Sequence, residues 1–431
     1  MEDKNLKNGN NSVKYPDAEA KALCPLPFVH PFFDVRGLYS ACCNGSFSKD
    51  SKHVSEMTAE QWFYSEDMRQ LRHDMLVGNR NSMCDHCWKK DDLGIPSPRF
   101  THHETWKWNN IDYDNPKPQF FDLKPSNHCN LACIFCTASS SDKILKITKA
   151  LDPSDQPSRW AGSVRAVEER EKQYGSTFDP HVVNYIKNNV EDLKILKFTG
   201  GEPFLSKEVL EILRAISERN PKVEIKITTN GTVITKDFYP ILEKMEKISI
   251  KFSIDAVDDL YSYIRFPSKW EQFQGRIENN MTSLPGVKFN VNCLITNMNL
   301  AQLPKIRNWF KELQSKYSNL EYIIIDPNLT PDFNESSLYM MDPLVLKKIK
   351  KQLEIDTADW NMSCRTDKQI LSVYKKIDDA INNNIYNSER RFKKYVHDEF
   401  TRQNRIRKIN IKDVVEPVSK SFFENILKED F

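Results

Sequence analysis

The 431-residue sequence has no run of apolar residues long enough to cross a bilayer. Its first segment, MEDKNLKNGNNSVKYPDAEA, also lacks the apolar core of a secretory signal peptide. No charge of one sign dominates, because 62 Lys and Arg residues are matched by 60 Asp and Glu residues. The composition therefore gives no reason to expect a membrane or a nucleic acid as a partner, and we expect a soluble, cytoplasmic protein.

The ten cysteines are unevenly distributed, since eight of them precede residue 137. In a reducing cytoplasm cysteines rarely form a disulfide framework, so clustered cysteines indicate metal binding or catalysis. We therefore expect metal chemistry in the first third of the chain.

The pattern of the sequence divides the chain into four parts. Residues 1–22 are polar and rich in Asn and Lys, and we expect them to be flexible. Residues 23–115 predict a loop-rich module with a small hairpin, turning at Gly37, and one helix between Thr58 as N-cap and Gly78. Such a module would need a metal to hold it together. The last two parts are an α/β region over 116–335 and a charged helical extension over 336–431.

In the α/β region, strand-like and helix-like segments alternate. Six apolar segments predict strands near residues 119, 193, 223, 248, 287 and 320, with helices such as 207–219 and 235–247 between them. This alternation is typical of parallel strands with right-handed crossovers, in an open doubly wound sheet or in a complete or partial barrel.

The stretch SNHCNLACIFC at 126–136 places Cys129, Cys133 and Cys136 directly after the first predicted strand. Barrels and open α/β sheets carry their chemistry at that edge. Iron–sulfur clusters normally take four thiolates, so three would leave one iron open to an outside ligand. The alternatives are a zinc knuckle or three unrelated buried cysteines.

CNLACIFC resembles the CxxxCxxC signature of the radical S-adenosylmethionine (SAM) superfamily. The resemblance implies that these three cysteines hold a [4Fe-4S] cluster whose open iron is chelated by SAM, with Phe135 beside the adenine. In that superfamily, reduction of the cluster cleaves SAM to a 5′-deoxyadenosyl radical, which abstracts hydrogen from the substrate. The implied fold is a partial (β/α)6 barrel of the TIM type.

Two further segments match the superfamily at the ends of the next strands. FTGGEPFLS at 198–206 resembles its GGEP loop, in which Gly200 and Gly201 allow a close approach to a ligand and Glu202 accepts from an ammonium group. TTNGT at 228–232 contributes Asn230, although that motif alone also fits an ordinary turn.

The fourth strand carries the remaining SAM contacts that the resemblance implies. FSIDA at 252–256 resembles the segment whose Ser and Asp bind the SAM ribose, here Ser253 and Asp255. Arg265 is placed like a superfamily arginine near the SAM carboxylate, with a surface arginine as the alternative.

A second set of cysteines lies in the N-terminal module. Cys24, one of the adjacent pair Cys42 and Cys43, and the CxxC pair Cys84 and Cys87 suffice for a four-thiolate site. Adjacent cysteines cannot easily face one metal together, so we choose Cys42 and keep Cys43 as the alternative. Zinc is the alternative metal. The segment is similar to the auxiliary modules called twitch or SPASM domains, which implies one auxiliary [4Fe-4S] cluster.

Taken together, the motifs predict a radical SAM enzyme that abstracts hydrogen from an unidentified small-molecule or peptide substrate. The resemblance implies a flavodoxin- or ferredoxin-type electron donor. The reaction is left open between epimerisation, dehydrogenation and peptide modification. Cys293 and Cys364 are candidate hydrogen donors to a substrate radical, although Cys293 also fits a small buried side chain. The alternative function is a zinc or iron–sulfur binding module whose barrel has lost catalysis.

Overall fold

The computed structural model describes most of the chain. The described ranges are 22–34, 37–48, 51–92, 97–106, 111–124, 126–174, 180–327, 335–360, 364–386 and 390–429. The predicted flexible segment therefore lies, except for Ala22, outside the described residues.

Six parallel strands form one sheet, in which they follow one another in sequence order. They are β3 (Phe120–Leu123), β4 (Ile195–Phe198), β5 (Glu224–Thr229), β6 (Ile248–Ser253), β7 (Lys288–Ile295) and β8 (Leu320–Pro327). A doubly wound sheet would reverse its strand order, and a closed barrel would pair its first strand with its last. The sheet does neither, so the predicted partial (β/α)6 barrel is confirmed.

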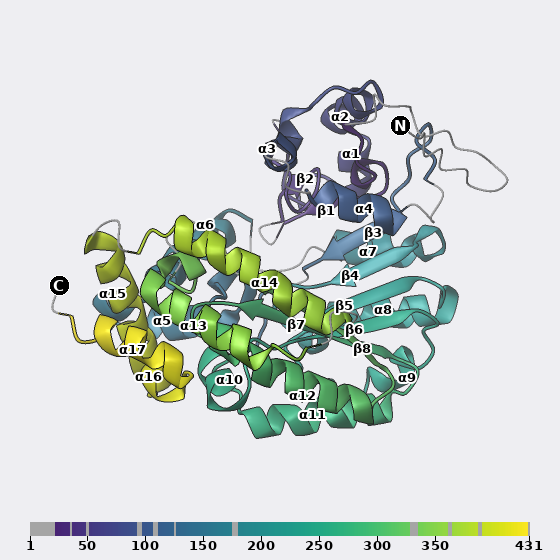
Figure 1. Ribbon diagram of the computed structural model, residues 1–431. Helices are drawn as coiled ribbons and strands as arrows, with labels where there is room; N and C mark the ends of the chain where they lie inside the picture. The colour runs from purple at the N-terminus through teal and green to yellow at the C-terminus, as the bar shows by residue number, and fades with distance from the viewer. Residues whose placement is uncertain are drawn as a thin grey trace, which may run out of the picture.

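Helices fill the crossovers and cover the apolar side of the sheet (Figure 1). The first crossover holds α5 (Asp142–Ala150), α6 (Ser158–Tyr174) and α7 (Pro180–Asn188). The later crossovers hold α8 (Lys207–Arg219), α9 (Tyr239–Leu242), α10 (Asp258–Ile264), α11 (Trp270–Ser283) and α12 (Leu303–Lys316). The predicted helix 207–219 is confirmed, whereas 235–247 contains only the single turn of α9, which begins beside Pro240.

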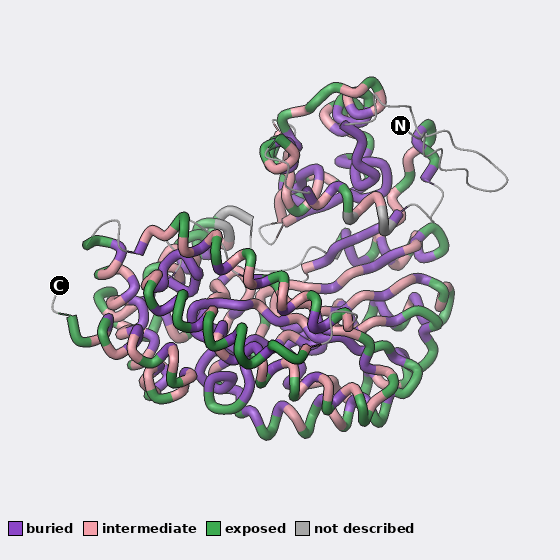
Figure 2. The backbone as a smooth tube through the Cα atoms, viewed as in Figure 1, coloured by how far each residue is buried: buried purple, intermediate pink, exposed green. Residues whose placement is uncertain are grey.

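Burial alternates along the central strands, as Figure 2 shows by colour. In β5 and β6 every second residue is buried, and all of these except Thr229 are apolar, whereas the residues between them are polar and partly exposed. Period-two alternation puts these two sets on opposite faces of the sheet. One face therefore joins the core with the helices, and the other is a polar, concave face.

The N-terminal module contains a short hairpin and four helices. The elements are β1 (Phe32–Phe33), β2 (Tyr39–Ser40), α1 (Ala59–Phe63), α2 (Glu66–Leu76), α3 (Asp85–Asp92) and α4 (Pro98–Trp106). Thr58 caps α1 and Gly78 follows α2 with a positive φ, as predicted. The single predicted helix is wrong, because Ser65 accepts a hydrogen bond from Met68 N and starts a second helix.

The C-terminal extension is helical, as predicted. It consists of α13 (Pro343–Asp356), α14 (Arg365–Asn382), α15 (Arg390–Arg407), α16 (Ile411–Val414) and α17 (Pro417–Ile426). The last helix docks through Phe423, whose ring meets that of Phe400 edge to face at 5.1 Å between centroids. Among the described residues, no helix combines the length and the apolar character that a membrane span needs.

Ile250 tests the core on the apolar face of the sheet. It is fully buried in β6, so Ile250→Ala should lower the free energy of unfolding by about 2–5 kcal/mol. Ile355→Ala, at a position in α13 that is 63% exposed, is the matched control and should have little effect. Chemical denaturation followed by circular dichroism measures both, and equal losses would contradict the assignment of Ile250 to the core.

Candidate functional site

The cysteine loop, residues 126–136, follows β3 at the carboxyl edge of the sheet. Its backbone is tied to the end of α10: Ala132 N donates to Phe266 O at 2.7 Å, and Ile134 N donates to Ile264 O at 3.0 Å. The side chain of Asp142 accepts a hydrogen bond from Cys129 N at 2.9 Å. These bonds fix the loop before any ligand is considered.

The three thiols of the cysteine loop lie close together in a buried setting. Burial is the main reason that the pKa values of the Cys129 and Cys133 thiols are raised to about 12. The neighbouring Cys136 contributes to the increase in both. Two donors from other parts of the barrel face them: Asn230 Nδ2, after β5, lies 3.7 Å from Cys129 Sγ, and Arg265 Nη1, at the end of α10, lies 3.9 Å from Cys133 Sγ. Buried thiolates at this site would need a cationic centre, which is what a metal cluster supplies.

Gly200 and Gly201 allow a close approach, but the partner is the chain itself. A Cβ at residue 201 would lie 2.3 Å from the carbonyl oxygen of His128, immediately before Cys129. Gly200 has φ +99°, and its Cβ would lie 3.1 Å from the backbone of Lys124. The two glycines therefore let the GGEP segment pack directly against the cysteine loop.

Glu202 is buried in the same place and is already hydrogen-bonded. Its carboxylate accepts from Asn230 N and from Thr229 Oγ1, both at 2.7 Å. Burial raises its pKa to about 7, although these hydrogen bonds favour the charged form. The carboxylate thus joins the ends of β4 and β5, and its predicted contact with an ammonium group stays a prediction.

Asp255 and Arg265, both predicted SAM contacts, form a buried ion pair at 2.5 Å. Asp255 also accepts from Leu294 N at 2.9 Å. Ser253 is half-buried, on the concave face of β6, and Phe135 is half-buried in the cysteine loop. Four strand ends and one helix end thus bring the predicted cofactor residues to one edge of the sheet.

Arg407, in the C-terminal extension, is a residue of this site that the sequence did not indicate. Its guanidinium group is 3% exposed and donates to Ala132 O at 2.9 Å and to Tyr263 O at 2.6 Å. Arg407 and Ala132 are 275 residues apart, so no local pattern could connect them. This arginine therefore ties the C-terminal extension to the cysteine loop and to α10.

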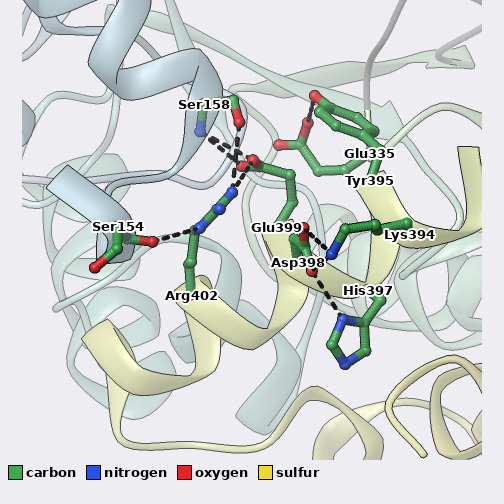
Figure 3. A network of polar contacts seen from close by, with 9 residues as sticks. All are labelled: Ser154, Ser158, Glu335, Lys394, Tyr395, His397, Asp398, Glu399 and Arg402. Carbon is green, nitrogen blue, oxygen red and sulfur yellow. Dashed lines mark hydrogen bonds and ion pairs between the residues drawn. The ribbon is translucent and has the colours of Figure 1, made fainter. Parts of the chain in front are cut away.

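Figure 3 shows how α15 is bound to the start of α6. The carboxylate of Glu399 accepts from Ser158 N at 2.9 and 3.1 Å and from Arg402 Nη1 at 2.9 Å. The adjacent Arg159 donates to Phe135 O at 3.3 Å. The C-terminal extension therefore forms one wall of the site around the cysteine loop.

The four chosen cysteines of the N-terminal module also lie near one another. The pKa of Cys24 is raised to about 12, mainly by burial and also by the nearby thiols of Cys84 and Cys87. The pKa of Cys84 is likewise raised to about 12, mainly by burial and also by the nearby thiols of Cys42 and Cys87. The thiol of Cys43 instead lies among groups of the barrel: after burial, its pKa responds most to Asp122 and then to Lys197 and Lys124.

A buried arginine accompanies this second cysteine set. Arg99 in α4 is 7% exposed, pairs with Asp91 at 2.5 Å and donates to Leu23 O at 2.8 Å. It lowers the pKa of Cys24 and Cys84, and so favours their thiolate forms. Its positive charge would offset part of the negative charge that four thiolates bring into the module.

Neither cysteine set is drawn together around a single point. Within the part of the chain that the structure describes, no three Cys, His, Asp or Glu side chains converge as one metal ion would require. Zinc binds its ligands about 2.0–2.3 Å from one centre, whereas the thiolates of an iron–sulfur cubane bind different irons.

The two candidate hydrogen donors lie in different surroundings. Cys293 is fully buried on the same side of β7 as Val291 and Ile295, the apolar side of the sheet. This position agrees with the alternative of a small core side chain, and the donor role stays a prediction. Cys364 is the N-cap residue of α14 and is half-buried.

Substitution of Gly201 tests the packing of the GGEP segment against the cysteine loop. Gly201→Ala would force the His128 carbonyl away, so we expect the loss of about four irons of about eight in the reconstituted chain. Gly275→Ala in α11 is the control, because its Cβ meets nothing within 4 Å. Iron analysis and the melting temperature measure the outcome, and full iron retention by Gly201→Ala would contradict the proposed contact.

Comparisons with known proteins connect this geometry to a family. The profile of the Radical SAM superfamily matches residues 123–310, which include the cysteine loop and every strand from β4 to β7. "GTP 3',8-cyclase" from Mannheimia succiniciproducens is 32% identical over 122 residues, 27% of this chain and 35% of the relative. "Cysteine-type anaerobic sulfatase-maturating enzyme" from Clostridium perfringens is 24% identical over 217 residues, 48% of this chain and 51% of the relative.

The alignments cover only part of each relative. The chain spans about a quarter to a half of the length of the curated relatives that it matches. "Molybdenum cofactor biosynthesis protein moc-5" from Caenorhabditis elegans, for example, is 26% identical over 42% of this chain and 28% of the relative. Among solved structures, "Native anSMEcpe with bound AdoMet" aligns at 19% identity and a TM-score of 0.36, over 55% of this chain and 58% of that one. The Streptococcus suis protein SuiB, bound to S-adenosylmethionine, aligns at 16% identity and a TM-score of 0.34, over 66% and 62%. Residues 123–310, with CxxxCxxC at the end of β3, therefore belong to the Radical SAM superfamily.

Proposed function

We propose that this protein is a radical SAM enzyme in which Cys129, Cys133 and Cys136 hold a [4Fe-4S] cluster. The observation that carries the proposal is the meeting of these thiols with residues from the ends of β4, β5, β6 and α10 at one edge of the sheet. When bound, the cluster and SAM supply the 5′-deoxyadenosyl radical that abstracts hydrogen from the substrate. The protein's own contribution is to hold the thiols, orient SAM and exclude water.

The residues around the cysteine loop divide this work. Asn230 and Arg265 direct donors at two of the thiol sulfurs, which stabilises their ionised form. Ser253, on the concave face, is available to the SAM ribose, and the Asp255–Arg265 pair fixes the end of β6 beside it. Glu202 offers its carboxylate to the SAM ammonium group at the same edge.

An auxiliary [4Fe-4S] cluster bound by Cys24, Cys42, Cys84 and Cys87 is part of the proposal. The mutual influence of these four thiols supports Cys42 as the ligand, because Cys43 lies among barrel residues. In this proposal the auxiliary module covers residues 23–115, the barrel 116–335 and the helical extension 336–431. Electrons would come from a flavodoxin- or ferredoxin-type donor.

The reaction type is proposed only as far as its first step. The relatives' names describe the maturation of a sulfatase and the cyclisation of GTP, two different substrates. Hydrogen abstraction is the step that a shared radical SAM domain supports for this chain. The product is that of an epimerisation, a dehydrogenation or a peptide or small-molecule modification.

SAM cleavage tests the proposed function. The anaerobically reconstituted chain should form 5′-deoxyadenosine from SAM with dithionite, measured by liquid chromatography and mass spectrometry. Cys133→Ala should form none and keep about four irons, those of the auxiliary cluster. Cys364→Ala, outside both cysteine sets, should cleave SAM like the unmodified chain. Absence of cleavage by the unmodified chain, with a host extract added as a source of substrate, would refute the proposal.

The adjacent pair Cys42 and Cys43 provides a matched test of the auxiliary site. Cys42→Ser should lose about four of about eight irons per chain, because one of four ligands is removed. Cys43→Ser should keep its full iron content. Iron and zinc are measured after anaerobic reconstitution. Iron loss in Cys43→Ser but not in Cys42→Ser would make Cys43 the ligand in place of Cys42, and tightly bound zinc without iron would exclude the auxiliary cluster.

A further inference from the structure

Three lysines lie on the concave face of the sheet, on neighbouring strands. Lys197 in β4, Lys226 in β5 and Lys251 in β6 occupy alternate positions between buried apolar residues. Lys197 and Lys226 have side chains 38% and 40% exposed, and Lys251 is half-buried. We call these three residues the lysine face. Such positions on a barrel strand look into the space that the sheet encloses.

The strand register places the lysine face in a continuous polar surface. Lys197 pairs with Lys226 across β4 and β5, and Thr228, two residues further along β5, pairs with Lys251. The same row continues through Asn290 to Tyr322 in β8, whose ring is covered by the Arg365 guanidinium at 4.3 Å. Neighbouring strands lie about 4.8 Å apart, so long lysine side chains on them can reach a shared ligand.

The charges on this face do not balance among the described residues. Lys197 pairs with Asp122 at 2.7 Å and Lys226 with Glu224 at 2.8 Å, which leaves Lys251 without an acidic partner. Burial lowers the pKa of the Lys251 ammonium group, and Lys197 and Lys226 lower it further, with no acidic group acting in the opposite direction. Keeping a half-buried cation beside two others costs stability unless an anion joins them.

The lysine face lies next to the proposed SAM position. Lys251 precedes Ser253 by two residues on the same side of β6, about 6.6 Å along the strand. On the N-terminal side, His102 of α4 lies near the lysine face, since burial and then the charge of Lys197 lower its pKa to about 4. A ligand group bound by Lys251 would thus lie between the proposed SAM site and the module.

We infer that the concave face binds an oxyanion of the substrate, a phosphate or a carboxylate group, with Lys251 as its principal cationic contact and Lys197 and Lys226 as supporting charges. The inference rests on the proposed function for the identity of the ligand as substrate. Anion binding itself does not require SAM cleavage, so the two can be tested separately. A substrate without an anionic group would leave Lys251 uncompensated.

Calorimetric titration tests the anion site on the full-length, anaerobically reconstituted chain at low ionic strength. Pyrophosphate and malonate serve as separate probes, and they distinguish a phosphate site from a carboxylate site. We expect one of them to bind, with an affinity about tenfold lower for Lys251→Met, as expected for loss of a charged hydrogen bond. Lys316→Met is the control, because Lys316 ends helix α12, is 51% exposed and pairs with Glu312 of the same helix.

A second measurement keeps the test independent of how the variants fold. The unmodified chain is treated with limiting acetic anhydride, with and without the bound probe, and lysine acetylation is read by mass spectrometry. The probe should slow acetylation of Lys251 by at least about threefold and leave Lys316 unchanged, because a charged contact shields the amine. Absence of binding by both probes, equal binding to Lys251→Met, or equal acetylation of Lys251 with and without probe would overturn the inference.

The proposed function is tested by a different readout. Formation of 5′-deoxyadenosine from SAM by the unmodified chain is measured beside anion binding by the same chain. A chain that cleaves SAM but binds neither anion keeps the proposed function and loses the anion site. A chain that binds an anion through Lys251 but never cleaves SAM keeps the anion site and loses the proposed function.

Discussion

The cysteine loop is held in place by hydrogen bonds from parts of the chain that are far apart in sequence. The two glycines of the GGEP segment pack against the backbone of the loop or of the residues just before it. The side chains of Asn230 and Arg265 reach its sulfurs from the ends of β5 and α10. Arg407 holds it from the C-terminal extension. The thiols of the loop must match the positions of the irons in an inorganic cluster. A loop that is fixed from several sides keeps its thiols in such positions.

Buried positive charge accompanies both cysteine sets. Arg265 lies beside Cys133 in the barrel, and Arg99 lies among the cysteines of the N-terminal module. Each arginine is itself paired with a buried aspartate, Asp255 or Asp91, which keeps it charged and oriented. Burying several thiolates is costly without compensating cations, so the two arginines perform the same electrostatic task at two places. The lysine face on the sheet is different, because one of its cations has no acidic partner among the described residues.

Much of the barrel could be predicted from the sequence, because period-two and helical patterns are local. The six strands and the helix over 207–219 were found in this way, and the three-cysteine motif was placed correctly at the end of β3. Local details decided the errors: Ser65 caps a second helix where one was predicted, and only the single turn Tyr239–Leu242 forms where a longer helix was predicted. Arg407 and the packing partner of Gly201 could not be predicted, since both depend on contacts between distant segments. The alternating pattern of β5 and β6 indicates that Lys226 and Lys251 lie on the polar face of the sheet. Only the strand register shows that these lysines are neighbours on that face.

The central claim is that SAM binds a cluster held by the cysteine loop, while a second cluster lies apart from it. Electron paramagnetic resonance of the dithionite-reduced chain, recorded before and after addition of SAM, tests this most directly. We expect SAM to change the spectrum of one reduced cluster and to leave that of the other unchanged, and the SAM-sensitive signal to vanish in Cys129→Ala. A spectrum that SAM does not change, or a SAM-sensitive signal that survives in Cys129→Ala, would contradict the claim.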